Sequence, residues 1–261
     1  MYAFEFERPA TLEDAVSALA AEDAQALAGG QTLIPTLKQR LAMPSKLVSL
    51  TGIDALRGIR TDDQGRLVIG AATPHVEVAA QSDYPALAGL AANIGDPAVR
   101  NRGTIGGSLA NNDPSACYPA AALGSGAVIV TNTREIAADD YFTGLFETAL
   151  EEGEIITEVK FPLPERAAYI KFEQPASRFA LVGVFVAKQA GGVRVAITGA
   201  SEGGVFRWSE AEAAISSNFS AAALEGLSLP ADGMISDLHG PAAYRAHLAA
   251  VLTGRAVTAA G

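Results

Sequence analysis

The residues best suited to bind a ligand lie in two segments rich in glycine and small polar side chains. The first segment, AGGQTLIP, runs from Ala28 to Pro35 between a predicted strand and a predicted helix. Its two glycines allow the backbone to approach a ligand closely, and free N–H groups at the start of a helix favour an anion. The segment predicts a phosphate or pyrophosphate site, although an ordinary strand-to-helix turn accounts for the same residues. It is neither a Walker A loop nor a G-x-G-x-x-G motif.

The second segment, RNRGTIGGSLANNDPSACYP, runs from Arg100 to Pro119 and combines glycines with hydroxyl and amide side chains. Such a stretch is unsuited to a hydrophobic core because its polar groups need hydrogen-bond partners. It predicts either a cradle for a ligand or a long loop held by turns of Asn and Asp. No acid–base pair stands out between the two segments, so together they favour a cofactor site over a hydrolytic site.

Residues that commonly bind metals are few and scattered. Cys117 is the only cysteine, which excludes an internal disulfide and a cysteine-bound metal cluster held by this chain alone. His75, His239 and His247 lie far apart in the sequence, with a spacing that matches no metal-binding motif. We therefore expect no metal site, and we interpret Cys117 as a small buried residue rather than a redox-active thiol.

The composition narrows the class of protein further. The 261 residues include 19 Lys and Arg against 29 Asp and Glu, a net charge of -10, which argues against a nucleic-acid partner. Hydrophobic residues make up 49% of the chain, enough for a substantial core. No apolar run reaches the roughly 18 residues of a membrane span, and the first residues lack the pattern of a signal peptide. We expect a cytoplasmic protein without a membrane span.

Helices are predicted where apolar residues recur every three or four positions. Thr11, followed three residues later by Asp14, resembles a capping box at the start of the first helix. Gly95 to Pro119 is instead predicted to be rich in turns. The predicted helices cover residues 9–21, 36–44, 75–81, 84–94, 209–217, 220–227 and 240–257.

Strands are predicted where β-branched and apolar residues cluster between turn signals. Asn132 to Arg134 has the composition of a hairpin turn, and Gly191 with Gly192 marks a second one. The predicted strands cover residues 24–28, 46–50, 66–73, 127–132, 134–142 and 154–162, with two more within 179–200. A change of composition at residues 163–168 marks a candidate domain boundary. The mixture predicts two lobes of an α+β protein.

Four segments, in their order and spacing, resemble the FAD-binding medium subunit of molybdenum hydroxylases. That family includes the flavoprotein subunit of aerobic carbon monoxide dehydrogenase and, more distantly, the flavin domain of xanthine dehydrogenase. The resemblance extends almost end to end, because residues 237–257 are similar to the C-terminal helix of the family. The four segments are AGGQTLIPTLKQRLAMPSKLV, RNRGTIGGSLANNDPSACYPAA, GEIITEVKFP and YIKFEQPASRFALVGV.

The resemblance implies a fold and a division into domains. The expected fold is a two-lobed FAD-binding fold of the p-cresol methylhydroxylase and vanillyl-alcohol oxidase type, followed by a smaller α+β C-terminal domain. The FAD-binding domain is expected at residues 1–165, with subdomains at about 1–52 and 53–165. Residues 166–261 are expected to form the C-terminal domain.

The resemblance also implies which residues bind FAD. The first segment matches the loop around the pyrophosphate, and the second matches a loop for the phosphate and the ribityl chain. Two isoleucines match positions that flank the isoalloxazine ring, although two core isoleucines are equally consistent with the sequence. Lys171 matches a lysine near the pyrimidine end of the flavin, where a cation stabilises the reduced ring. The implied residues are Ala28, Gly29, Gly30, Gln31, Thr32, Leu33, Ile34, Ile94, Thr104, Ile105, Gly106, Gly107, Ser108, Asn111, Asp113, Ile156 and Lys171.

The chain departs from the xanthine dehydrogenase-like pattern at two positions. Cys117 and Arg178 each stand where those members have an aspartate. Both changes remove negative charge near the implied cofactor, which bears on the flavin potential and on the choice of electron acceptor.

The function implied is electron transfer within a larger enzyme. In this family a large molybdopterin-binding subunit oxidises the substrate and a small subunit carries two [2Fe–2S] clusters, in an expected dimer of heterotrimers. The FAD of this chain would take electrons from the clusters and pass them to an external acceptor. The single cysteine agrees, since the cluster ligands must come from another chain. The alternatives are a self-sufficient FAD-dependent oxidoreductase, which needs an acid or base beside the flavin, and a flavin-free scaffold subunit.

Overall fold

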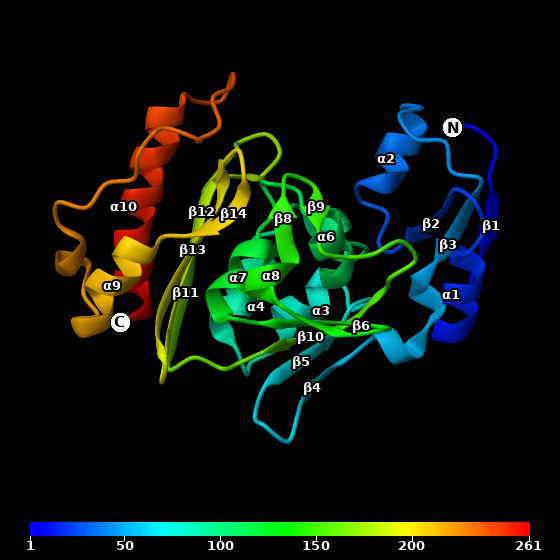
Figure 1. The fold of residues 1–261 in the computed structure, drawn as a ribbon, viewed down its shortest axis with the longest axis horizontal. Coiled ribbons are helices and arrows are strands. Elements are labelled where there is room, and N and C mark those ends of the chain that lie inside the picture. The colour runs from blue at the N-terminus through cyan, green and yellow to red at the C-terminus, as the bar shows by residue number, and fades with distance from the viewer.

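The computed structural model describes residues 1–261 and shows three lobes that follow one another along the long axis of the molecule (Figure 1). The N-terminal lobe contains a three-stranded sheet, the central lobe a five-stranded sheet and the C-terminal lobe a four-stranded sheet. The two chain ends lie at opposite ends of this row (Figure 1). Helices and strands are interspersed along the chain, which confirms the α+β prediction.

The N-terminal lobe follows local sequence signals closely. The Thr11 hydroxyl accepts a hydrogen bond from the Asp14 N–H at 3.1 Å and so caps the first helix, as predicted. The second helix starts earlier than predicted, and it also ends earlier, because Arg40 adopts a left-handed backbone conformation with φ of 60°. The strands β1 and β2 both pair in parallel with β3. The elements are β1 (Glu5–Glu7), α1 (Leu12–Leu19), β2 (Ala24–Leu27), α2 (Leu33–Lys38) and β3 (Lys46–Ser49).

The central lobe is an antiparallel sheet with helices packed on it, in the strand order β4-β5-β10-β6-β7. It is joined to the N-terminal lobe by the 3-10 turns η1 (Leu50–Gly52) and η2 (Asp54–Leu56). Its strands are β4 (Ile59–Thr61), β5 (Leu67–Gly70), β6 (Val128–Thr131), β7 (Glu135–Ala137), β10 (Ile156–Phe161) and the small hairpin β8 (Phe142–Gly144) and β9 (Glu147–Thr148). Its helices are α3 (His75–Ala80), α4 (Pro85–Ala92), α5 (Pro97–Arg100), α6 (Ile105–Asn111), α7 (Tyr118–Ser125) and α8 (Ala138–Tyr141).

The structure corrects two predictions in the central lobe. About half of the second glycine-rich segment is helical, because the Thr104 hydroxyl accepts a hydrogen bond from the Gly107 N–H at 3.1 Å and so caps α6, and α7 begins at Tyr118. The alternative of a long loop is therefore wrong for the helical half, whereas the rest consists of turns, including one in which the Asp113 carboxylate accepts from the Ser115 N–H. The strand predicted over residues 134–142 ends after Ala137, where the chain turns into α8. Capping by side chains outweighed the low helix propensity of glycine in the first case.

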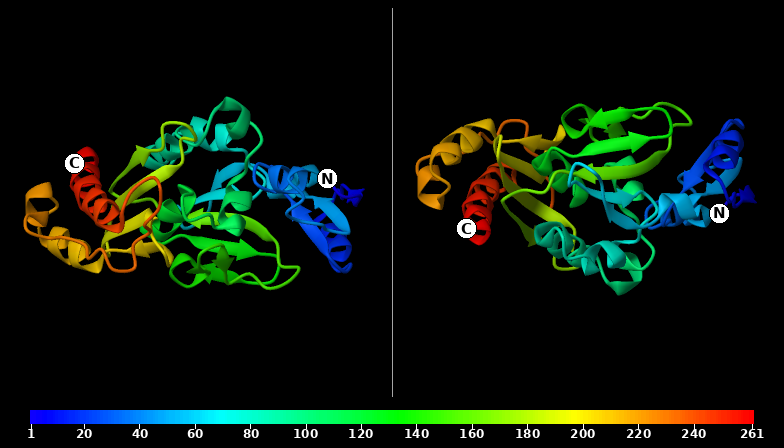
Figure 2. Two further views of the ribbon diagram at one scale, coloured as in Figure 1. Left: turned by 90° about the horizontal axis from the view of Figure 1, so that it is seen from above. Right: turned by 90° about the horizontal axis from the view of Figure 1, so that it is seen from below.

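The C-terminal lobe is a four-stranded meander that lies between the central lobe and the helices α9 and α10 (Figures 1 and 2). The helix predicted over residues 220–227 is only the short 3-10 turn η3 (Ala221–Leu224). No helix, including the 19-residue α10, is long and apolar enough to cross a bilayer. The elements are β11 (Arg166–Glu173), β12 (Ala180–Gln189), β13 (Gly192–Ser201), β14 (Gly204–Arg207), α9 (Ser209–Ser217) and α10 (Ala242–Ala260).

Strand β12 joins two hydrophobic cores. Side chains alternate across a strand, so its two faces can serve different cores. Val182 and Val184 lie in the core under α9 and α10, whereas Phe185 and Ala187 lie in the central core. This explains why the first eight residues of β12 are all buried. Strand β11 begins at Arg166, beside the expected domain boundary, and that boundary stays a prediction because the central core continues across it.

Candidate cofactor-binding site

A cavity of about 480 Å³ lies where segments from all three lobes meet. Both glycine-rich segments line it, together with residues around Ile94 and Ile156 and the tip of the loop between β11 and β12. The volume falls within the roughly 300–1,000 Å³ typical of ligand sites. The fold therefore brings segments about seventy residues apart in the sequence to one cavity.

The two glycine-rich segments pack directly against each other through their glycines. A Cβ atom at Gly29 would collide with the Arg102 carbonyl oxygen and lie 2.6 Å from the Gly103 Cα. A Cβ atom at Gly107 would lie 3.1 Å from the Cβ of Ala28. Glycine at these positions thus allows one segment to approach the other, in addition to any approach to a ligand.

The first segment presents a run of unpaired donors to the cavity. The main-chain N–H groups of residues 29–33 donate no hydrogen bond within the protein, although Gly29 is buried and all five residues line the cavity. The start of α2 at Thr32 has no side-chain cap. Buried N–H groups are rarely left without a partner, so the Gly29 N–H requires an acceptor from outside the chain, and the more exposed donors of residues 30–33 are open to the same acceptor. A phosphate or pyrophosphate oxygen meets that requirement.

The second segment contributes differently. The N–H groups of Ile105 and Gly106 donate to the carbonyls of Thr73 and Ala71, and that of Gly107 donates to the Thr104 hydroxyl. Its main chain therefore has little left to offer an anion. Beyond the helix start it lines the cavity with the polar side chains of Ser108, Asn111 and Asp113.

Asp113 belongs to a tight turn at the edge of the cavity. Its carboxylate accepts a hydrogen bond from the Ser115 N–H at 2.8 Å. Burial raises the pKa of Asp113, and the Ser115 N–H partly opposes this. The carboxyl group is therefore easier to protonate than an exposed aspartate, which suits a hydrogen-bond contact to a hydroxyl-rich or anionic ligand.

Most of the predicted FAD-binding residues line the cavity, but three do not. Ile105 is fully buried in the central core, and Ile34 packs against Gly30, whose φ is 72°. Lys171 does not line the cavity, but it contacts the lining residues Cys117 and Arg178 from behind. The predicted residues that line the cavity are Ala28, Gly29, Gly30, Gln31, Thr32, Leu33, Ile94, Thr104, Gly106, Gly107, Ser108, Asn111, Asp113 and Ile156.

The Lys171 side chain is only 3% exposed, and its ammonium group interacts with residues at and beside the cavity lining. Its ammonium donates to the carbonyl oxygens of Asn93 at 2.5 Å and Arg178 at 2.8 Å, and lies 3.9 Å from the Cys117 Sγ. Arg178 has a left-handed backbone with φ of 61°, which is unfavourable for a side chain other than glycine. Lys171 thus braces the loop between β11 and β12 against the segment beside Ile94.

Lys171→Met will loosen the loop that carries Arg178. The variant keeps the length of the side chain but removes two charge-assisted hydrogen bonds. We expect trypsin to cleave after Arg178 about tenfold faster, because cleavage follows the population of the open loop. Lys188→Met removes an ion pair with Glu165 and a contact with the Phe219 ring, neither of them part of the loop between β11 and β12; it is the control and should cleave like the wild type. Equal cleavage of both variants would show that Lys171 does not brace the loop.

The two departures from the xanthine dehydrogenase-like pattern both line the cavity. Cys117 is buried, as expected, and burial raises the pKa of its thiol, so the thiol is protonated at neutral pH. Arg178 points a guanidinium Nη1 at the Gly95 carbonyl oxygen, 3.5 Å away. The mouth of the cavity therefore carries a cation.

His75 is a cavity residue that the sequence did not single out. Its imidazole is buried beside the Tyr118 ring, with the ring centroids 5.3 Å apart, and its Nδ1 atom has no hydrogen-bond partner. Burial, with a smaller effect from Arg100, lowers the pKa of His75 to about 4, so the ring is neutral at neutral pH. The signal for this position was the junction of β5 with α3, which places His75 at the start of the helix that follows the end of a strand.

The arrangement suits the binding of a phosphate-bearing cofactor better than acid–base catalysis. The lining combines free N–H donors, apolar side chains and hydroxyl or amide groups, with a neutral imidazole and a protonated thiol. No group of three or more His, Cys, Asp or Glu side chains is placed to hold a metal ion. The donors of the first segment and the glycine contact between the segments fit a dinucleotide such as FAD.

Comparisons with known proteins agree with this geometry. Residues 2–164 match the family model described as the FAD binding domain in molybdopterin dehydrogenase. The carbon monoxide dehydrogenase medium chain of Hydrogenophaga pseudoflava is 32% identical, over 98% of this chain and 96% of the relative. The nicotine 6-hydroxylase medium subunit of Paenarthrobacter nicotinovorans is 33% identical, over 99% and 98%. A chain of the CO dehydrogenase structure from Oligotropha carboxidovorans superposes with a TM-score of 0.89 at 33% identity, over 99% and 98%.

Proposed function

Because the chain belongs to the family of FAD-binding medium subunits of molybdenum hydroxylases, we propose that it holds one FAD in the cavity and relays electrons within a multi-subunit enzyme. The observation that carries the proposal is the run of unpaired N–H groups at residues 29–33, held against the second glycine-rich segment. An FAD-binding domain is present in this chain, and the relatives are subunits of oxidoreductases.

In the proposed complex the first segment binds the pyrophosphate through its free main-chain donors. The side chains of Ser108, Asn111 and Asp113 serve the sugar and ribityl hydroxyls, and Ile94 with Ile156 flanks the flavin ring. Bound FAD supplies the redox chemistry, accepting and releasing electrons through its ring system. The chain itself orients the cofactor and sets the charge around it. Lys171 acts from behind the wall, where its charge favours the reduced ring without occupying the cavity.

We propose further that electrons arrive from a small [2Fe–2S] subunit and leave to an external acceptor, while a large molybdopterin-binding subunit oxidises the substrate. Two features of this chain support a relay rather than an independent enzyme. Its cavity offers no free base: the His75 pKa is lowered to about 4, burial keeps the Cys117 thiol protonated, and the Glu154 carboxylate is already engaged by Arg134 and by two threonine hydroxyls. Its single cysteine leaves cluster ligands to other chains. The proposed assembly is a cytoplasmic dimer of heterotrimers.

The visible spectrum of the purified chain tests the cofactor assignment. We expect oxidised-flavin absorption, with FAD and not FMN released on denaturation, at about one FAD per chain. Protein purified without flavin should regain it on incubation with FAD. A colourless chain that cannot be reconstituted would refute flavin binding and favour the scaffold alternative.

Co-purification from the native host tests the relay. We expect two partner chains, one with molybdopterin and one with iron and labile sulfide. A single flavin-containing chain that reduces its flavin with its own small substrate would instead favour the self-sufficient oxidoreductase.

A further inference from the structure

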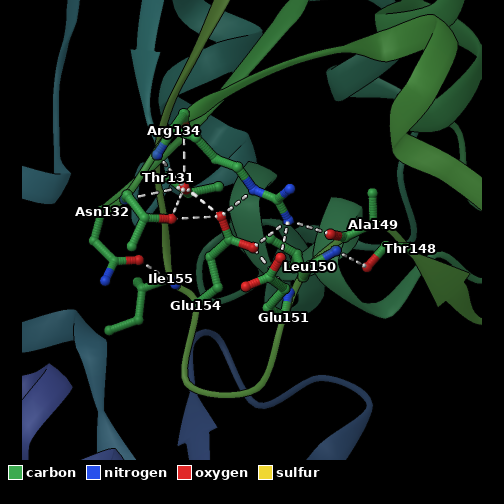
Figure 3. Close-up of polar contacts among 10 residues, drawn as sticks. Thr131, Asn132, Arg134, Thr148, Ala149, Leu150, Glu151, Glu154 and Ile155 are labelled. Atoms are coloured by element: carbon green, nitrogen blue, oxygen red, sulfur yellow. Dashed lines mark hydrogen bonds and ion pairs between the residues drawn. The ribbon is translucent and has the colours of Figure 1, made fainter.

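Glu154 is a buried carboxylate for which the proposed function has no use. Its side chain is only 2% exposed, and it accepts hydrogen bonds at 2.6 Å from the Thr131 hydroxyl and at 2.8 Å from the Thr133 hydroxyl (Figure 3). Arg134 donates from Nε and Nη2, both at 3.0 Å, and the Glu151 N–H donates at 2.8 Å. The Arg134 guanidinium, helped by these donors, holds the pKa of Glu154 well below its usual range.

This cluster fastens two separate loops together. Thr131 to Arg134 form the turn between β6 and β7, and residues 149–155 form the loop that leads into β10. Arg134 Nη2 also donates to the Ala149 carbonyl at 2.7 Å, at the start of that loop (Figure 3). At its other end the Ile155 N–H donates to the Asn132 side chain at 2.8 Å, and the Asn132 N–H donates to the Ile155 carbonyl at 3.0 Å.

The loop of residues 149–155 contacts both the N-terminal lobe and the central lobe, which carry the two glycine-rich segments. Ile155 packs in the core of the N-terminal lobe with Val48 and Leu56, whereas Ile156 packs in the central core. Successive side chains of an extended segment point to opposite sides, so these two neighbours reach different lobes. Leu150, Glu154, Ile155 and Ile156 also line the cavity.

We propose that Glu154 and Arg134 form an interlobe buckle that sets the spacing between the N-terminal and central lobes, and thereby between the two segments that hold the cofactor. Glu154 is a positioning residue in this proposal, because it acts through Ile155 and the loop. The proposal rests on the proposed function, since FAD retention is its functional consequence. The buckle holds Ile155 in the N-terminal core and keeps the free donors of residues 29–33 at a fixed distance from Thr104 to Ser108.

Every partner of the Glu154 carboxylate is a hydrogen-bond donor, so replacing Glu154 with the isosteric glutamine tests these hydrogen bonds directly. One carboxylate oxygen of Glu154 accepts from both threonines and from Arg134 Nε, and the other accepts from Arg134 Nη2 and from Glu151. In Glu154→Gln, either orientation of the amide turns its NH₂ group toward donors. The variant therefore breaks the buckle without changing the volume of the side chain.

Glu154→Gln should release FAD about tenfold faster than the wild type, measured from the rise of flavin fluorescence after dilution. In the flavin-free protein, amide hydrogen exchange should also rise about tenfold at Asn132 and Ile155. The Ala72 amide, which donates to the Leu56 carbonyl at 2.8 Å across the lobe joint, should exchange faster as well. Arg134→Lys, which keeps the positive charge but not the paired donors, should lie between Glu154→Gln and the wild type.

Two controls separate positioning from general stability. Glu135→Gln removes an exposed ion pair, at 2.6 Å to Lys160, from the same sheet and should leave FAD release unchanged. Leu252→Ala destabilises the distant core under α10 and should lower the melting temperature without speeding FAD release.

The outcomes separate this proposal from the proposed function. Unchanged exchange at Ile155 and Ala72 in Glu154→Gln would overturn the buckle, whether or not the wild type binds FAD. Wild-type FAD release in Glu154→Gln, or equally fast release in Leu252→Ala at matched melting temperature, would also overturn it. Failure of the wild type to bind FAD would overturn the proposed function and the role of the buckle in cofactor retention together, while faster exchange in Glu154→Gln would still establish the lobe contact.

Discussion

Gly29→Ala will purify largely without flavin, and its affinity for FAD will fall about 100-fold. The added methyl group would collide with the Arg102 carbonyl oxygen and with Gly103, both of them backbone groups that cannot rotate away. Overpacking of this kind costs about 1–3 kcal/mol, and each 1.4 kcal/mol is a factor of ten in affinity. The collision drives the first segment away from the second, so the free donors and Ser108 no longer reach one cofactor. FAD content after denaturation and a reconstitution titration measure the effect.

The matched control is Gly89→Ala in α4, where an added Cβ atom meets no other atom within 4 Å. That variant should bind FAD normally and stabilise its helix by about 0.5–1 kcal/mol. Gly30 is a less informative site, because its φ of 72° strains any side chain regardless of the cofactor. Normal FAD content and affinity in Gly29→Ala would show that the close contact between the two segments is unnecessary for binding.

Phe185→Ala will lower the free energy of unfolding by about 3–5 kcal/mol, the usual cost of removing a buried aromatic ring. Phe185 is fully buried, and its ring lies 6.1 Å from that of Tyr84 and 6.3 Å from that of Tyr169, centroid to centroid. It stands on β12 of the C-terminal lobe but packs in the central core. The loss should therefore weaken the joint between these lobes as well as the core itself.

Urea denaturation of the flavin-free protein measures this effect without a contribution from ligand binding. Phe6→Ala is the control, since Phe6 on β1 is 59% exposed and its removal should change stability by less than about 0.5 kcal/mol. A loss below 1 kcal/mol in Phe185→Ala would mean that the ring is not part of a tightly packed core.

Local features of the chain were predictable where short-range chemistry decides the structure. The Thr11 cap, the alternating strands and the last helix follow from spacing within a few residues. Predictions failed where a neighbouring interaction overrode the local pattern. A side-chain cap at Thr104 started a helix within a glycine-rich stretch, and a left-handed residue at Arg40 ended α2 early.

In the candidate site, too, some features follow from the local sequence and others depend on residues that are distant in the chain. Glycines in two segments predicted a ligand site from local chemistry, and both segments line one cavity, while the binding of a ligand there stays a prediction. Glu154 escaped notice because nothing near it in the sequence marks a cavity wall, and His75 was considered only as a metal ligand although it follows a strand-to-helix junction. The position of Lys171 behind the wall depends on Asn93, 78 residues away, which no local pattern encodes.

The sequence by itself determined the family and the α+β class, and it predicted the segments that line the cavity. Only the tertiary structure decided how these segments meet: that Gly29 lies against Arg102 and Gly103, that the first segment keeps its donors free while the second uses its own, and that Glu154 links two loops of the central lobe beside the N-terminal lobe. The physical reason is the range along the sequence over which each kind of interaction acts. Propensity, capping and periodicity act over a few residues, whereas close approach, burial and hydrogen-bond satisfaction depend on partners that the folded chain brings together.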